Sequence, residues 1–578
     1  MFSKTYINIS KILFLSLLFT ANAGFGQRPL EIDEIKVVAP YEPSISDAFK
    51  ININPVILDT MTVQIDFDYS IQPRKIVTRF EPEPLSPARM RGEPLAKLYR
   101  GLVKGGFGNY QTPYFEGFYN TLRSNEYALG VHLRHLSSGN DIEGYDRSTF
   151  SQNKANVYGT RFFRNTSLDA SVLFDRHSLR YYGLPENDTL FPAGADTKQR
   201  FELLSSTIGF GTHFADSTRL NYRFGLEHHW LNDRFDASEH HFRATAMLGR
   251  DIGEDPFGLA WKQYFQLDVS ADYFYKKAPG FTQGVMPLPT DTFNTGIYSI
   301  RPGIYSYYDR IKFNIGINLS VQDSIANYEV RAYPVAGFEA MIVPDKLLFH
   351  VGLKGGLEKQ SLRRLTDTNP FVHSSVQTGF SNVRSEISGG FRGSFGNKLS
   401  YNLSVINSNI DNYPLFFNMY RPDGPFPMLD NRFGLFYDDV TILNFRAELS
   451  ARFGERFSMR LQGDYFDYSL EQMLKAWHMP DYTMSLNMKY NLQDKIILTA
   501  DLFGRGPAYG IDLENFANPA RRLHDFYLDA NLGVEYRYTK VLSVFLNFYN
   551  MQNESYERWT YYPTQSFGFL GGISYSFR

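Results

Sequence analysis

The chain ends in SFGFLGGISYSFR (residues 566–578), and this stretch decides the fold. Aromatic and aliphatic residues recur at every second position, with glycine and serine among the residues between them. An alternation of period two places the two sets on opposite faces of a β-strand. The face expected to meet lipid comprises Phe567, Phe569, Gly571, Ile573, Tyr575 and Phe577, and the face expected to meet a lumen comprises Ser566, Gly568, Gly572, Ser574 and Ser576.

The same alternation recurs upstream, for example in residues 127–134, 265–273, 311–319 and 526–536. Many of these segments run for about 10–14 residues, whereas strands of soluble proteins have a mode of about 5–6. Short turns such as Asp309-Arg310 and Gln493-Asp494 alternate with longer links, which is the rule for outer-membrane barrels. A β-propeller is the best soluble alternative, but no blade repeat of about 40–50 residues is present.

These patterns predict an all-β fold, a transmembrane antiparallel up-and-down β-barrel over residues 98–578 in the cell outer membrane. We count about 22 strands, give or take about two to four, with short periplasmic turns and long external loops. An even number of strands places both ends of the barrel on the periplasmic side. Outer-membrane lipids are then the first expected partner.

Composition narrows the function classes. Aromatic residues make up 16% of the chain, in keeping with the aromatic girdles of membrane barrels. The formal net charge is −2, so nothing favours nucleic acid as a partner. The chain has no cysteine, which excludes disulfides, cysteine-ligated zinc, iron–sulfur clusters and an acylated cysteine anchor.

The N-terminal region reads as two segments. Residues 1–23 have the form of a signal peptide, with Lys4 and Lys11 before an apolar run that is too short to span a bilayer. Cleavage could extend to residue 26. Residues 24–97 are rich in proline, and we expect them to form a periplasmic or lumen-lying extension.

The last strand also resembles the C-terminal signal that the barrel-assembly machinery reads, which commonly ends in an aromatic residue. The resemblance makes that machinery an expected partner, although Arg578 follows the final aromatic residue. The alternative is a sheet-closing strand of a soluble protein. The residues carrying the assembly signal would be Phe569, Ile573, Tyr575 and Phe577.

A second resemblance involves the first predicted strand. The stretch GGFGNYQTPY (residues 105–114), followed by Asn120, Leu122, Arg123 and Ser124, resembles Bacteroidetes-type outer-membrane barrels described as TonB-dependent-receptor-like. Residues 33–39 look like the energy-coupling box of that class, which would bind a TonB-type protein by adding a strand to its sheet. The box residues would be Glu34, Ile35, Val37 and Val38; the alternative is a plain extended segment.

The resemblance has one departure. Receptors of this class carry a large folded plug before the barrel, and residues 24–97 are too few for a complete one. The sequence therefore predicts a barrel without a full plug.

No motif indicates an enzyme, because no Gly-x-Ser-x-Gly, Walker loop or His-Glu-x-x-His is present, and no cofactor is expected. One constellation could hold a metal. A hairpin symmetric about Phe235 would make His229 and His241 direct cross-strand partners that point inward, with Glu239 on the same face. The alternative is a pair of rim histidines bonded to water and loop groups.

Two further features concern the lumen. The inward-facing charges are mixed in sign, which argues against an ion-selective pore and suits pairs that brace the wall. The longest predicted loop, residues 410–439, is rich in proline and aromatic residues. It could constrict the mouth, dock a surface partner or form a packed cap over the rim.

We expect transport or uptake of a solute across the outer membrane, since a barrel this wide needs either a passage or a filling. The alternative is a filled barrel that acts as a scaffold or accessory subunit with other outer-membrane proteins. The first reading predicts conductance in planar bilayers, and the second predicts a blocked lumen and co-purifying proteins.

Overall fold

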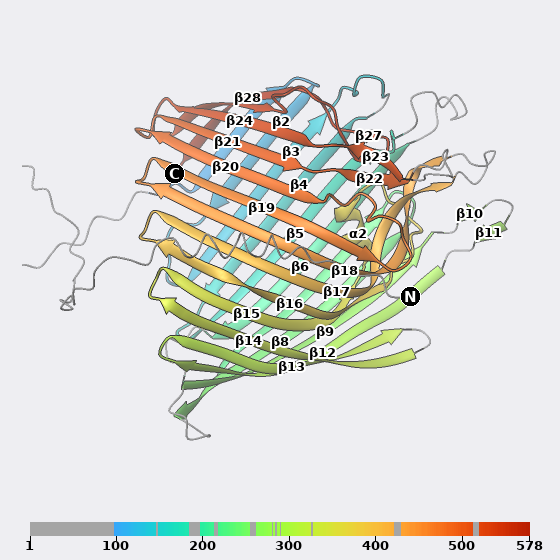
Figure 1. Cartoon of the computed structure of the whole chain (residues 1–578). Helices are drawn as coiled ribbons and strands as arrows, with labels where there is room; N and C mark the ends of the chain where they lie inside the picture. Colours follow the sequence, from blue (N-terminus) through green and yellow to red (C-terminus); the bar gives the residue numbers. More distant parts are fainter. Residues whose placement is uncertain are drawn as a thin grey trace, which may run out of the picture. The chain divides into compact units, whose positions relative to one another are not determined.

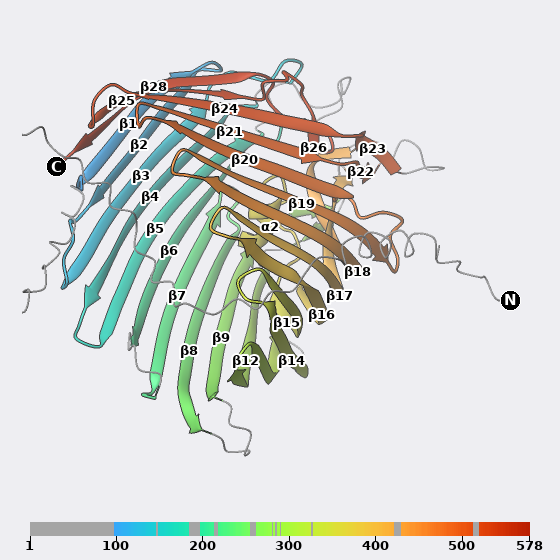
Figure 2. The same cartoon turned by 60° about the vertical axis from the view of Figure 1, so that its left-hand side comes forward.

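The computed structural model describes residues 98–145, 148–183, 197–212, 218–254, 262–279, 281–283, 286–288, 291–324, 327–420, 429–511 and 520–578. A closed antiparallel sheet of 22 strands dominates this part of the chain. Each strand pairs with the next one along the chain, and β1 pairs with both β2 and β28 to close the ring (Figure 2). The prediction of a 22-stranded up-and-down barrel is confirmed.

The barrel strands, in chain order, are β1 (Gly101–Gly108), β2 (Thr112–Asn120), β3 (Tyr127–Ser138), β4 (Phe150–Phe162), β5 (Thr166–Arg180), β6 (Lys198–Thr212), β7 (Asn221–Asp233), β8 (Ser238–Glu254), β9 (Lys262–Ala278), β12 (Asp291–Tyr308), β13 (Ile311–Ser324), β14 (Asn327–Val343), β15 (Leu347–Lys359), β16 (Phe380–Phe395), β17 (Leu399–Tyr420), β18 (Leu429–Phe453), β19 (Phe457–Leu470), β20 (Tyr482–Leu492), β21 (Ile496–Arg505), β24 (Tyr527–Arg537), β25 (Leu542–Tyr549) and β28 (Gly568–Phe577).

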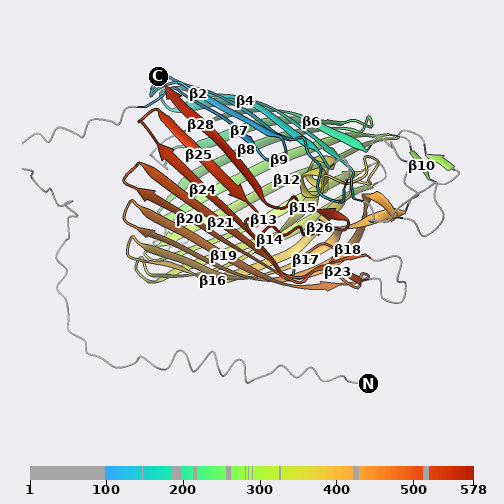
Figure 3. The ribbon, with the colours of Figure 1, turned by 90° about the horizontal axis from the view of Figure 1, so that it is seen from above.

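Among the described residues, three short hairpins and one helix lie in the links between the barrel strands. They are the hairpins β10–β11 (Phe281–Gln283 and Met286–Leu288), β22–β23 (Ala508–Ile511 and Ala520–His524) and β26–β27 (Glu557–Trp559 and Tyr562–Pro563), and the helix α2 (Leu362–Thr368). All of them lie toward the same end of the barrel, on the right in Figure 1. The tight turns gather at the opposite end, and the view from above shows the same division (Figure 3). We call the end with the links the outer end, because outer-membrane barrels have short turns on the periplasmic side.

The turn residues explain why the inner end is tight. Gly396 and Gly454 have φ values of +65° and +63°, a region that glycine enters without steric cost. Gln493 and Asp494 both have positive φ, as the two central residues of a type I′ hairpin turn require. These conformations match the twist of the flanking strands and keep the periplasmic turns short.

The outside of the wall is apolar. Ile573 of β28 is 55% exposed and Ile315 of β13 is 62% exposed, and residues at the same alternation on neighbouring strands are also exposed. Serines such as Ser574 and Ser320 are buried on the opposite face. Closure of the sheet pairs the backbone N–H and C=O groups between strands, and the apolar outer side chains can contact the lipid hydrocarbon. The chain therefore forms a barrel of the outer-membrane type. Among the described residues, no helix is long and apolar enough to cross a membrane.

One sequence prediction is wrong. Residues 410–439 were expected to form a loop, but β17 and β18 run through most of this range and pair with each other up to Tyr420 and Leu429. The pairing continues because a hairpin standing above the membrane can complete its own ladder, and the bulge near Asn412 absorbs the irregularity.

Candidate functional site

The outer mouth is occupied by the link between β15 and β16, residues 360–379, which folds back toward the lumen and carries α2 (Figure 1). Ser361 caps the helix by accepting a hydrogen bond from the backbone N–H of Arg364 at 3.2 Å. Glu239 of β8 also binds the N-terminus of this helix. Its carboxylate accepts from the N–H groups of Leu362 and Arg363, at 2.7 and 3.2 Å, and the residue is only 2% exposed. A buried carboxylate at a helix N-terminus is favourable, because the first N–H groups of a helix lack partners within it.

An apolar cluster packs around this link, and we call the cluster and the link together the cap. The members of the cluster come from segments far apart in the sequence, and their side chains are almost fully buried. They are Leu179, Tyr181, Phe201, Leu231, Ala237, Leu362, Leu365, Val372, Val376, Phe416, Phe433, Trp559 and Tyr562. Of the three roles considered for residues 410–439, the packed cap describes Phe416 and Phe433.

Buried hydrogen bonds fix the cap to the wall. Gln199 of β6 donates to the Tyr181 hydroxyl at 3.0 Å and to Asp233 at 3.1 Å. Tyr181 donates in turn to the carbonyl oxygen of Val372, at 3.1 Å. Buried polar groups that are fully paired define one geometry, so these bonds place the link in a single position.

Two histidines are held neutral, His373 in the cap and His478 packed against Phe433 and Trp559 of the cap. His478, in the link between β19 and β20, bonds through Nε2 to the Thr560 hydroxyl at 2.8 Å and through Nδ1 to the carbonyl oxygen of Phe416 at 3.2 Å. A carbonyl only accepts, so Nδ1 carries the proton. Burial lowers the pKa of His478 to about 3, and burial likewise lowers the pKa of His373 to about 3.

Beneath the cap lies a chamber of about 890 Å³. Charged residues of both signs line it, and several pair with a neighbour: Lys354 Nζ lies 2.9 Å from Glu386, and Arg364 lies 2.7 Å from Glu358. The expected mixture of charge signs is confirmed. The first of these pairs joins neighbouring strands and so braces the wall locally.

The predicted histidine pair lies at the edge of this chamber. His229 and His241 are direct cross-strand partners with ring centroids 5.5 Å apart, so the predicted register is confirmed. Nε2 of His241 lies 2.8 Å from Asp272. Glu239 is not brought to the pair, since both of its oxygens bind α2. Among the described residues, no three histidine, aspartate or glutamate side chains are grouped closely enough to hold a metal ion.

The remaining predicted residues fall into two groups. Glu34, Ile35, Val37 and Val38 lie outside the described residues. Phe569, Ile573, Tyr575 and Phe577 lie in β28, which closes the ring against β1. The sequence did not predict the cap, apart from the contribution of the aromatic residues in 410–439.

Comparison with known proteins gives fold-level similarity only. No protein-family model and no curated protein matches the chain. Among solved structures, the closed form of the ferric-catecholate import receptor Fiu of E. coli K12 has a TM-score of 0.61 at 10% identity, covering 83% of this chain and 82% of that one. The FrpB iron transporter of Neisseria meningitidis has a TM-score of 0.62 at 9% identity, covering 84% and 82%. A mutant form of the ferric enterobactin receptor PfeA of Pseudomonas aeruginosa has a TM-score of 0.59 at 11% identity, covering 82% and 80%.

These likenesses establish the fold. At such identities they say nothing of the solute, and the comparison leaves the residues of the cap and the chamber without an assigned role.

Proposed function

We propose that this protein takes up a solute across the outer membrane and that its passage is closed from outside by the cap. The chamber of about 890 Å³ carries the proposal, because it is a polar space of ligand size inside a wall wide enough to admit a solute. Two solved neighbours, named as an import receptor and an iron transporter, support the same direction.

The finer parts of the proposal come from the sequence. We infer a relative of TonB-dependent receptors from Bacteroidetes-type bacteria that lacks a full plug, in which Glu34, Ile35, Val37 and Val38 bind a TonB-type coupling protein. The cap would then do at the outer mouth part of what a plug does. Ferric siderophores are the first solutes to test, since the neighbours' names include them.

Conductance in planar bilayers tests the passage. We expect the parent chain to be nearly silent, and a variant with residues 362–376 replaced by a short Gly-Ser linker to conduct steadily. The variant should be measured with and without residues 24–97, so that any filling by this segment is separated from the cap. Silence in both forms would contradict a passage.

The second candidate is a filled barrel that acts as a scaffold or accessory subunit. The extent of the buried cap favours it, because a mouth packed like a protein core suits a wall that never opens. It predicts silence in every conductance arm and a stoichiometric outer-membrane partner in gentle detergent extracts.

A further inference from the structure

Between β14 and β15 the ladder of the wall is incomplete. β14 pairs with β15 only over Ala336–Val343 and Leu347–Leu353. On their other sides, β13 pairs with β14 out to Asn327, and β16 pairs with β15 out to Lys359. Residues 327–335 of β14 and 354–359 of β15 therefore form two edges with no described ladder between them, and we call this the seam.

The local sequence explains the seam. Pro334 has no N–H to donate, and proline inside a sheet is confined to edges and bulges. On the opposite edge, a Cβ at Gly355 would lie 2.7 Å from the Tyr333 ring and 2.9 Å from the carbonyl oxygen of Val383. Only glycine fits there, so the Tyr333 ring lies against the bare backbone of β15.

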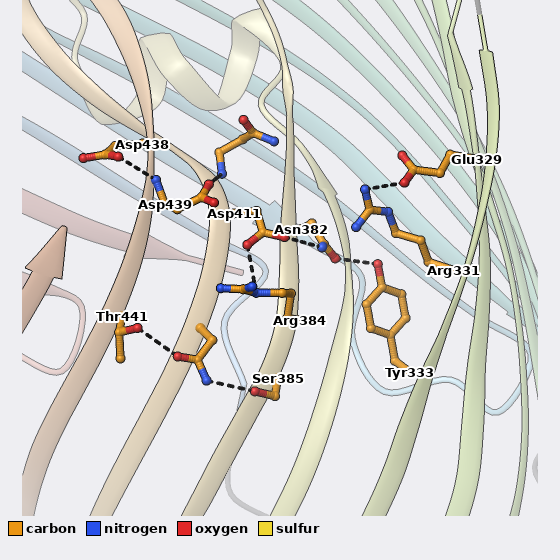
Figure 4. Close-up of polar contacts among 12 residues, drawn as sticks. Glu329, Arg331, Tyr333, Asn382, Arg384, Ser385, Asp411, Asp438, Asp439 and Thr441 are labelled. Carbon is orange, nitrogen blue, oxygen red and sulfur yellow. Dashed lines mark hydrogen bonds and ion pairs between the residues drawn. The ribbon is translucent and has the colours of Figure 1, made fainter. Parts of the chain in front are cut away.

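Side chains tie the seam in place of a ladder. Tyr333 points from β14 toward β16 and its hydroxyl donates to Oδ1 of Asn382 at 2.6 Å (Figure 4). Asn382 in turn donates to Asp411 at 2.7 Å. Asn318 of β13 reaches the carbonyl oxygen of Gly355 at 2.9 Å. These bonds can break without disturbing a ladder.

The seam joins the chamber to the outer leaflet. On the inner side, Asn318, Lys354 and Gly355 line the chamber. On the lipid side, the part of β14 that pairs with β15 is shorter than the roughly 9–11 residues a tilted strand needs to cross the hydrocarbon. The seam therefore begins within the hydrocarbon layer.

The seam offers apolar contacts on its outward face and charged side chains toward the chamber. Tyr328 and Val330 of β14 are 78% and 70% exposed, and they share the outward face with Leu319 and Ile315 of β13. On the other edge, Lys354 and Glu358 of β15 line the chamber. An apolar chain would find contacts on β14, and a polar head would find them in the chamber.

We propose that the seam is a lateral opening that admits an amphiphile with a polar head and an apolar chain from the outer leaflet into the chamber, with Tyr333 as its latch. The cap closes the axial route above, so a membrane-dissolved ligand meets the seam first. The inference rests on the proposed uptake function and gives it a ligand class.

Because the natural chain has no cysteine, single cysteines report access cleanly. Lys354→Cys places a thiol at the chamber side of the seam. Lys154→Cys is the matched control, since Lys154 also points into the lumen but lies on β4, which is paired continuously with β3 and β5. Each full chain, in lipid nanodiscs, is reacted with membrane-dissolved N-dodecylmaleimide and with water-soluble N-ethylmaleimide.

We expect the ratio of the dodecyl to the ethyl rate to be at least tenfold higher for Lys354→Cys than for Lys154→Cys. Adding Tyr333→Phe should raise the dodecyl rate at Lys354→Cys several-fold, whereas Tyr328→Phe, on the same strand, should not. Equal ratios at the two sites, or no reaction of Lys354→Cys with either reagent, would overturn the opening. An unchanged rate with Tyr333→Phe would overturn the latch. Labelling does not depend on transport, so these failures leave the conductance test of uptake intact.

Discussion

Glu239 is the residue on which the position of α2 depends most directly. Its side chain is buried and satisfies two N–H groups of the helix. Glu239→Ala leaves both donors without their partner, and an unsatisfied buried donor costs about 1–3 kcal/mol. The change should therefore destabilise the docked helix by about 2–6 kcal/mol. Glu239→Gln keeps one acceptor oxygen but loses the charge, so we expect about 1–2 kcal/mol.

The closed barrel should hardly respond, because its ladder is untouched, so the assay must be local. Hydrogen exchange of amides in residues 362–376 measures the free energy of opening of this link. A loss of about 1.4 kcal/mol corresponds to roughly tenfold faster exchange, so Glu239→Ala should accelerate it by about 30-fold or more. Glu227→Gln, a half-exposed chamber carboxylate on β7, is the control and should change nothing. Exchange in Glu239→Ala that matches the parent would refute the reasoning.

Three further outcomes follow from the cap and the histidine pair. Trp559→Ala removes a ring that lies 5.2 Å from Phe416 and 5.7 Å from Phe433, and it should weaken the cap by about 3–5 kcal/mol, seen as bursts of conductance in planar bilayers that Trp559→Phe largely suppresses. The cap should also loosen in acid, because burial holds the pKa of His373 and of His478 at about 3, below the value in the unfolded state. The contribution of these two histidines to the stability of the cap is therefore complete above about pH 6.5 and is lost as pH falls toward 3. At pH 5 the loss is about 2 kcal/mol for each histidine. Exchange of cap amides at pH 5 and pH 7.5, corrected for the intrinsic rates, checks this, and a pH-independent opening energy would contradict it. Finally, we propose that His229 and His241 bind zinc weakly. In calorimetry, the heat of zinc binding should be lost when both histidines are replaced by alanine. It should be retained in Glu239→Gln, because the carboxylate of Glu239 is engaged by α2 and does not reach the pair.

Local sequence patterns were enough to predict the barrel wall. Alternation on strands such as β28, and turn residues such as Asn397 and Asp494, act between neighbours in sequence, so strand faces and hairpin register follow from them. The same logic predicted that His229 lies opposite His241, because a short hairpin fixes its own register.

The cap could not be predicted in this way. Tyr181, Val372, Phe433 and Tyr562 contact one another across separations of many strands, and nothing in the local pattern of any one link names its partners. The prolines of residues 410–439 also suggested a loop, although two paired strands tolerate Pro414 where the ladder is irregular. The seam was hidden for the opposite reason. Pro334 is a single residue in an otherwise regular strand, and its effect shows only in how β14 pairs with its two neighbouring strands.

The cap and the seam divide the exits of the lumen between two structures that are held by different contacts, although the pair Arg364–Glu358 joins them, and this division can be tested as a whole. The cap is fixed by apolar packing around Trp559, whereas the seam is tied by the hydrogen bond of Tyr333 to Asn382. Loosening the cap should therefore admit small polar solutes along the axis and leave lateral labelling unchanged. Removing the latch should raise lateral labelling and leave conductance unchanged. Trp559→Ala and Tyr333→Phe, each measured by both assays, give four results, and only the crossed pattern fits two separate exits. If both variants moved both readouts together, the lumen would open as one unit, and the chamber would have to be assigned to a single, shared route.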